Sequence, residues 1–172
     1  MDISSLLTQA GMDKETRIPP VEQWHPALSG DMDLTIRKDG TWWHEGTKFE
    51  REKLVRLFAS ILKREGDEYF LVTPVEKWRI KVEDRPLHIL MVERKDSDLS
   101  ALTSGGDLIT IGAKHPLKIS SLDDTDVPEV LVRGNLWARF TRNAYYQLTE
   151  LATITDDGEV FIESGGQRFP LI

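Results

Sequence analysis

The chain has 172 residues, of which 40% are hydrophobic and 30% charged, a composition typical of a globular protein and too apolar for a disordered one. Its formal net charge of −7 argues against a nucleic-acid partner, because binding to phosphates needs clustered lysine and arginine. The absence of cysteine excludes disulfides, thiolate nucleophiles, iron–sulfur clusters and cysteine-bound zinc, and it favours a cytoplasmic location.

In the N-terminal part, residues 1–30, we expect no signal peptide, since residues 1–7 lack the basic flank and long apolar core of one. No run of about 18 apolar residues occurs in the chain, so we expect no membrane span and no membrane partner. Residues 2–11 predict a short helix, with Asp2 as its cap and Gly11 as its stop. Prolines then favour an extended segment.

Residues 31–86 begin with the pattern of a hairpin followed by a helix. Asp39-Gly40 supplies a tight turn between a strand that ends near residue 37 and a strand over 41–44. Thr47 is the predicted N-cap of the helix, and Glu50 completes a capping box.

The same part of the chain continues with an apolar stripe and two strands. Apolar side chains recur at helical spacing as far as Leu62, and Gly66 is the predicted end of the helix. Strands are predicted over 69–72 and 78–82, separated by Thr73-Pro74.

Residues 87–128 predict inserted strands over 87–93, 108–111 and 117–119, which would extend the sheet. The stretch 121–128 contains three aspartates and indicates an acidic surface loop. It lacks the spacing and the closing glutamate of a calcium-binding EF-hand loop.

Residues 129–172 repeat the pattern of residues 31–86. At one offset of 94 residues, the second copy matches the first in a turn glycine, a strand tryptophan, a helix cap and two apolar helix positions. These matches are Gly134 with Gly40, Trp137 with Trp43, Thr141 with Thr47, Leu148 with Leu54 and Leu151 with Leu57. Beyond the helix the offset becomes 91, so we expect the second helix to be about one turn shorter.

This repeat predicts an α+β fold with a mainly antiparallel sheet, built from two copies of a hairpin–helix–strand motif. Each copy is too small to bury its own apolar face, so the two copies are expected to share one core. The hairpins indicate antiparallel pairing, with the helices on one face of the sheet.

Several stretches of the sequence are similar to those of one known family. They are GDMDL (30–34), DGTW (39–42), LVRLF (54–58), LVTPVEK (71–77), VEDRP (82–86), HPL (115–117) and VRG (132–134). Across nearly its whole length the chain resembles an uncharacterised bacterial family of domains of unknown function. The resemblance implies repeated small α+β motifs in an unusual fold and a role in signal transduction, and it transfers no catalytic residues.

The stretch 73–78 is the best candidate for a binding rim. Pro74 fixes the backbone where a strand ends, so that a donor and an acceptor stand beside an aromatic ring. The competing interpretation is a bulge with an exposed ion pair. The candidate ligand-binding residues are Thr73, Glu76, Lys77 and Trp78, together with Arg133 from the second copy.

No local catalytic or metal-binding motif is present. The four histidines are too far apart in sequence to form a chelating pair, and HExxH, P-loop, dinucleotide and nucleophile-elbow motifs are all missing. An alternative is a divalent-metal site in which Asp31, Asp33, His44 and Glu45 are brought together by the fold. The competing interpretation is a set of polar groups at turns and strand ends.

These observations leave three hypotheses for function. The first is a non-catalytic regulatory module, without a cofactor, that binds a small polar ligand or a protein partner between the two copies. The second is a metal-assisted hydrolase that uses the four residues of the alternative metal site. The third is a scaffold whose exposed sheet edges make it a homodimer.

Overall fold

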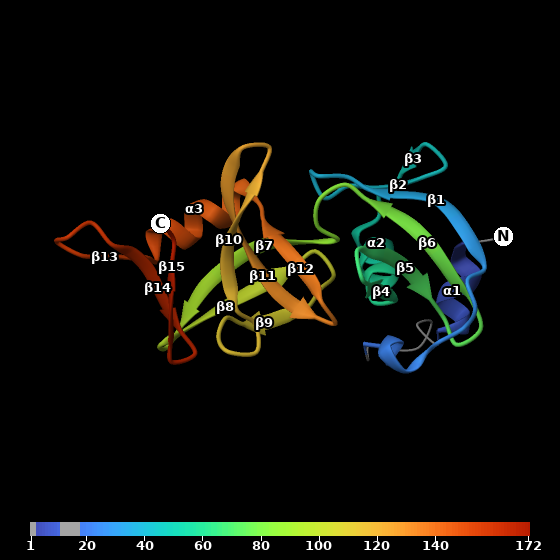
Figure 1. Cartoon of the computed structure of the whole chain (residues 1–172), viewed down its shortest axis with the longest axis horizontal. Coiled ribbons are helices and arrows are strands. Elements are labelled where there is room, and N and C mark those ends of the chain that lie inside the picture. Colours follow the sequence, from blue (N-terminus) through green and yellow to red (C-terminus); the bar gives the residue numbers. More distant parts are fainter. Residues whose placement is uncertain (1–2, 11–17) are drawn as a thin grey trace. The chain divides into compact units, whose positions relative to one another are not determined.

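The computed structural model describes residues 3–10 and 18–172. The chain divides into two compact units, Met1–Pro86 and Leu87–Ile172, which we call unit 1 and unit 2 (Figure 1). This division differs from the predicted single core shared by two small motifs. The physical reason is that residues 87–128 contribute four strands to unit 2 and give it a full sheet of its own.

The described residues of unit 1 form two helices, one 3-10 turn and a six-stranded sheet in the order β3-β2-β1-β6-β5-β4. Its elements are α1 (Ile3–Gln9), η1 (Val21–Gln23), β1 (Gly30–Ile36), β2 (Trp42–His44), β3 (Thr47–Lys48), α2 (Glu52–Ala59), β4 (Leu62–Glu65), β5 (Glu68–Val72) and β6 (Lys77–Val82). The predicted N-terminal helix is present as α1, whereas its predicted caps, Asp2 and Gly11, lie outside the described residues.

Two predictions for unit 1 are wrong at the ends of its second helix. Thr47 does not cap α2, because it lies in the short strand β3, and the N-cap position is held by Arg51 without a side-chain hydrogen bond. Leu62 belongs to strand β4 instead of the helix. Gly66, with a φ of 61°, therefore forms the turn between β4 and β5 and does not end α2.

Unit 2 contains a second six-stranded sheet, in the order β10-β11-β12-β7-β8-β9, and a separate three-stranded sheet, β13-β14-β15. Its elements are β7 (Leu87–Lys95), β8 (Asp98–Thr103), β9 (Leu108–Thr110), β10 (Leu117–Leu122), β11 (Thr125–Arg133), β12 (Leu136–Phe140), α3 (Arg142–Glu150), β13 (Thr153–Ile154), β14 (Val160–Ser164) and β15 (Gln167–Pro170).

Pairing in both six-stranded sheets is mainly antiparallel, as expected, but each sheet is mixed because it also contains one parallel pair. In each sheet two antiparallel three-stranded meanders meet at one central parallel pair, β1 with β6 in unit 1 and β12 with β7 in unit 2. Each parallel pair joins the strand of the sheet that comes first along the chain to the one that comes last. Hairpin signals, which involve neighbouring strands, therefore do not reveal these pairs. The two units therefore share one sheet layout.

The predicted acidic loop 121–128 is in fact a hairpin. Strands β10 and β11 pair through Ser121 with Asp126 and through Leu122 with Thr125. Only Asp123 and Asp124 form the turn, and both have positive φ, as a tight primed turn between antiparallel strands requires. The hairpin places Asp126 on a strand, where its position is set by the ladder.

The repeat is present as a hairpin, a helix and a three-stranded meander in each unit, β1-β2-α2-β4-β5-β6 and β11-β12-α3-β13-β14-β15. The offset of 91 residues is visible in the pairing of the meanders. Leu71 lies opposite Trp78 in unit 1, and Ile162 lies opposite Phe169 in unit 2. Positions 91 residues apart thus occupy equivalent places in the two meanders, an aliphatic residue opposite an aromatic one in each.

The second helix is not one turn shorter than the first, because α2 has 8 residues and α3 has 9. The offset changes before the helix, where unit 1 inserts strand β3 and a short connection that unit 2 lacks. In unit 2 the predicted cap is confirmed, since the Thr141 side chain accepts a hydrogen bond of 3.2 Å from the backbone N–H of Ala144.

The two copies differ in which strand the meander after the helix pairs with. In unit 1 its last strand, β6, pairs with β1 and completes the six-stranded sheet. In unit 2 the equivalent strand, β15, pairs only with β14, because β10 already occupies the corresponding side of β11. Strands β10 and β15 touch without forming a ladder.

Candidate functional site

A cavity of about 650 Å³ lies in unit 2 where β10 and β15 meet without pairing. Its walls come from both of these strands, from β11, from α3 and from the chain after β15. The lining residues are Leu117, Lys118, Ile119, Asp126, Tyr145, Pro170, Leu171 and Ile172. The volume falls within the range of about 300–1,000 Å³ that small-molecule sites commonly occupy.

The apolar walls follow from the local structure of the sequence. Leu117 and Ile119 are two residues apart on β10, so their side chains share one face of the sheet. Leu117 and Leu171 are nearly fully buried, with 5% exposure each. The Thr141 cap begins α3 one turn before Tyr145, which is half-buried and lines the cavity.

Three residues with ionisable side chains belong to the lining, and they differ in what those side chains already contact. The Lys118 ammonium lies 4.1 Å from the centroid of the Trp137 ring, in a cation–π contact. The carboxylate of Asp126 forms no hydrogen bond or ion pair within residues 3–10 and 18–172. In the same part of the chain the Tyr145 hydroxyl also has no hydrogen-bond partner.

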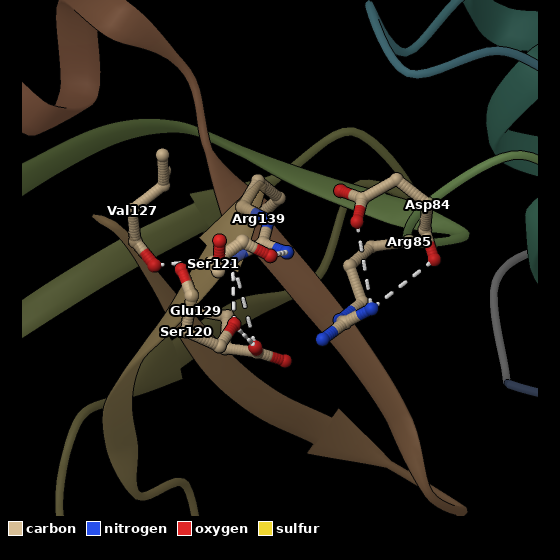
Figure 2. Close-up of polar contacts among 7 residues, drawn as sticks. All are labelled: Asp84, Arg85, Ser120, Ser121, Val127, Glu129 and Arg139. Atoms are coloured by element: carbon tan, nitrogen blue, oxygen red, sulfur yellow. Dashed lines mark hydrogen bonds and ion pairs between the residues drawn. The ribbon is translucent and has the colours of Figure 1, made fainter. Parts of the chain in front are cut away.

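A buried polar network holds β10 against the next two strands of the sheet (Figure 2). One guanidinium nitrogen of Arg139 donates to the hydroxyl of Ser120 at 2.7 Å and to the carbonyl of Val127 at 3.1 Å. It also lies 3.7 Å from the carboxylate of Glu129, which accepts a hydrogen bond from the Ser120 hydroxyl. Because Ser120 follows Ile119, this network fixes one wall of the cavity.

The predicted corner at residues 73–78 exists as the turn between β5 and β6. Thr73 is fully buried, accepts hydrogen bonds from the backbone N–H groups of Val75 and Glu76, and donates one to Gln9 at 2.8 Å. The indole N–H of Trp78 donates to Glu76 at 3.3 Å. Thr73 and Trp78 therefore serve the turn itself.

Glu76 retains one unsatisfied atom at this corner. Its Oε2 is buried and has no hydrogen-bond partner in the described part of the chain. An ordered water commonly satisfies such an oxygen. Glu76 is not among the lining residues of the unit 2 cavity.

Lys77 is part of a charged cluster within unit 1. Its ammonium pairs with Glu65 at 2.5 Å and lies 4.4 Å from the centroid of the Phe70 ring. Lys63, which is buried, pairs with the other oxygen of Glu65 at 3.3 Å. The hydrogen bond from Lys77, with the smaller contribution of Lys63, lowers the pKa of Glu65 below its ordinary value of 4.5.

The remaining predicted residues are not gathered into one site. Arg133 belongs to unit 2, where its Nε lies 3.4 Å from the Asp107 carboxylate. Asp31 pairs with Arg79 at 2.7 Å. Among the described residues no group of three or more His, Asp or Glu side chains could hold a metal ion, so Asp31, Asp33, His44 and Glu45 do not form a ligand set.

The cavity residues were missed by the sequence analysis. The cavity lies where the second copy departs from the first, but this departure is a difference in strand pairing, and no pattern in the sequence marks it.

In the described residues, no helix is both long and apolar enough to span a membrane.

Two family models match the chain and meet at the boundary between the units. One is described as "Domain of unknown function (DUF1285), N-terminal domain" and matches residues 19–85. The other is described as "Protein of unknown function (DUF1285), C-terminal domain" and matches residues 87–171. A search of the curated proteins finds no match.

Two crystal structures of proteins from this family are similar to the chain. The one from Silicibacter pomeroyi DSS-3 is 39% identical, covers 97% of this chain and 94% of its own, and has a TM-score of 0.85. The one from Shewanella baltica OS155 is 36% identical, covers 69% of this chain and 91% of its own, and has a TM-score of 0.56.

Proposed function

This chain belongs to the DUF1285 family, and we propose that it is a non-catalytic module that binds a small molecule in the cavity of unit 2. The observation that carries the proposal is the location of the cavity. It lies at the place where the second copy of the motif leaves two neighbouring strands unjoined.

The lining supports binding because it combines an apolar surface with a few polar groups. Leucine, isoleucine and proline side chains can bury the body of a ligand, and the Asp126 carboxylate and Tyr145 hydroxyl can fix its orientation. The network around Arg139 supports a wall that is formed before the ligand arrives, which limits the entropy lost on binding.

The chemistry of the lining favours binding over catalysis. Among the described lining residues, no side chain that could act as a nucleophile is hydrogen-bonded to a neighbouring base. Such a pair, with its base oriented by a third group, is the usual arrangement for covalent catalysis.

A regulatory role is the second part of the proposal. Occupation of the cavity would stabilise the contact between β10 and β15, and a partner protein that recognises this edge would sense the ligand. Signal transduction in the cytoplasm is the setting that we propose, and the absence of cysteine from the sequence is compatible with it.

The proposal can be tested by filling the cavity from one wall. Ile119→Trp places a large ring in the cavity, and Thr110→Trp places the same ring on β9, the opposite edge of the same sheet. A panel of nucleotides, amino acids, sugars, amines and aliphatic acids would be screened against the full chain by thermal unfolding. A ligand present at 100 times its Kd adds about 2.7 kcal/mol of stability.

We expect at least one ligand class to raise the Tm of the wild-type chain and of Thr110→Trp by about 5 °C or more, and to leave Ile119→Trp unchanged. A ligand that stabilises Ile119→Trp as strongly as the wild type binds elsewhere and contradicts the proposed site. If no class stabilises any variant, a protein partner replaces a small molecule as the occupant.

A further inference from the structure

We propose that the ligand of the unit 2 cavity is a small organic cation, with an apolar body and one primary amine placed beside Asp126. This inference rests on the proposed function and names the ligand class of the same site. It depends on which charges around the cavity are already engaged and which remain available.

The positive charge of the lining is engaged. Lys118 is the cationic side chain among the lining residues, and its ammonium lies over the ring of Trp137. Trp137 is not part of the lining, and Lys118 points to the face of β10 opposite to Leu117 and Ile119. An anionic ligand would therefore have to draw Lys118 away from its cation–π contact.

The negative charge of the lining is available. Asp126 is exposed, and within the described residues its carboxylate has no partner. The hairpin turn adds Asp123 and Asp124 within three residues of it, so the local potential attracts cations and repels carboxylates or phosphates.

The other free polar group fits the same ligand class. The hydroxyl of Tyr145 can accept a hydrogen bond from an ammonium group, or donate one to a hydroxyl on the ligand. The apolar lining residues leave the body of the ligand no further charged group to meet. One amine on a compact hydrocarbon therefore satisfies the site, whereas a sugar or a nucleotide leaves polar groups unpaired against leucine and isoleucine.

Three probes with the same six-carbon body separate charge from size. Hexylamine, 1-hexanol and hexanoate would each be titrated into the full ¹⁵N-labelled chain at low salt. Binding would be followed through the amide signals of residues 117–119 and 171–172. We expect hexylamine to bind about two- to fivefold more tightly than hexanol, the ratio that one exposed ion pair provides, and hexanoate to bind most weakly.

Two variants assign the preference to one carboxylate. Asp126→Asn should remove the advantage of hexylamine and leave the affinity for hexanol unchanged. Asp124→Asn is the matched control, because it removes a charge from the same hairpin at a residue outside the lining. It should retain most of the preference.

The outcomes separate this inference from the proposed function. If hexanol or hexanoate shifts the cavity signals and binds as tightly as hexylamine, the proposed cationic ligand class is wrong, and the cavity remains the proposed ligand site. The same conclusion follows if Asp126→Asn keeps the full preference for hexylamine. If none of the three probes shifts any cavity signal, both the ligand class and the cavity are overturned.

Discussion

Unit 1 and unit 2 build the same six-stranded sheet, and they differ in what they do with the meander that follows the helix. In unit 1, β6 closes against β1 and the sheet is complete. In unit 2, β10 takes that place and β15 is left beside it, unpaired on that side. A cavity is thus present in the unit whose copy of the motif leaves a strand out of the six-stranded sheet.

The largest loss of unfolding free energy is expected from a substitution in the buried pair of Arg139 and Glu129, which unit 1 lacks. Arg139 and Glu129 are 1% and 0% exposed, and the positions that match them at the offset of 94 are the exposed Glu45 and the half-buried Thr35. Arg139→Ala leaves Glu129 buried without its cation and should cost about 3–5 kcal/mol of unfolding free energy, measured by urea denaturation.

A matched variant in unit 1 and a double variant sharpen this prediction. Thr35→Ala should cost about 1 kcal/mol or less. Arg139→Met combined with Glu129→Leu should be more stable than Arg139→Ala, since no buried charge then remains. If Arg139→Ala and Thr35→Ala are equally mild, the network does not hold β10 in place.

The two helices give the second test of the comparison. Leu148 on α3 is fully buried, and its equivalent at the offset of 91, Leu57 on α2, is only half-buried. Leu148→Ala should cost about 2–5 kcal/mol and Leu57→Ala about 1 kcal/mol in the same denaturation experiment. Equal losses would mean that the helices are buried alike and that the offset is misplaced.

The helix caps give a smaller difference. Thr141→Ala removes the hydrogen bond to the N–H of Ala144 and should cost about 1 kcal/mol. Thr47→Ala, on strand β3, should change the stability by less than about 0.5 kcal/mol. A loss at Thr47 as large as that at Thr141 would support the capping box predicted from the sequence.

The smallest loss of unfolding free energy is expected from a substitution in the charged cluster of Lys63, Glu65 and Lys77 in unit 1. Because the pKa of Glu65 is lower in the folded chain than in the unfolded one, its contribution to stability is present above about pH 4.5 and is lost as the pH falls through the folded pKa. Glu65→Gln should lower stability at pH 7 by less than about 1 kcal/mol, since the group is partly exposed. A difference from the wild type that persists at pH 3 would contradict this assignment.

The sequence predicted the local features that a few neighbouring residues determine. The turn at Asp39-Gly40, the cap at Thr141 and the register of the two meanders are set by backbone preference and by alternating side chains, and all three are present. The error at Thr47 arose because a cap signal depends only on residue type, and a two-residue strand such as β3 carries almost no pattern of its own.

The parallel pairs and the cavity could not be predicted in this way. They depend on which strands, far apart in sequence, become neighbours, and only long-range packing decides that. The predicted corner at residues 73–78 was correctly placed at a strand end, yet its lysine and its indole N–H are used by contacts within unit 1. Asp126 could not be identified as a candidate binding residue from the sequence, because nothing in an acidic stretch distinguishes a ligand-binding aspartate from a solvated one.

We propose that the gap between β10 and β15 is a ligand site. Crystal structures of the full chain soaked with a fragment library that includes small amines would test this directly. We predict fragment density in the cavity lined by Ile119, Asp126, Tyr145 and Leu171, with β10 and β15 still unpaired. Crystals in which no fragment enters this cavity, or in which β15 is hydrogen-bonded along β10, would contradict the claim.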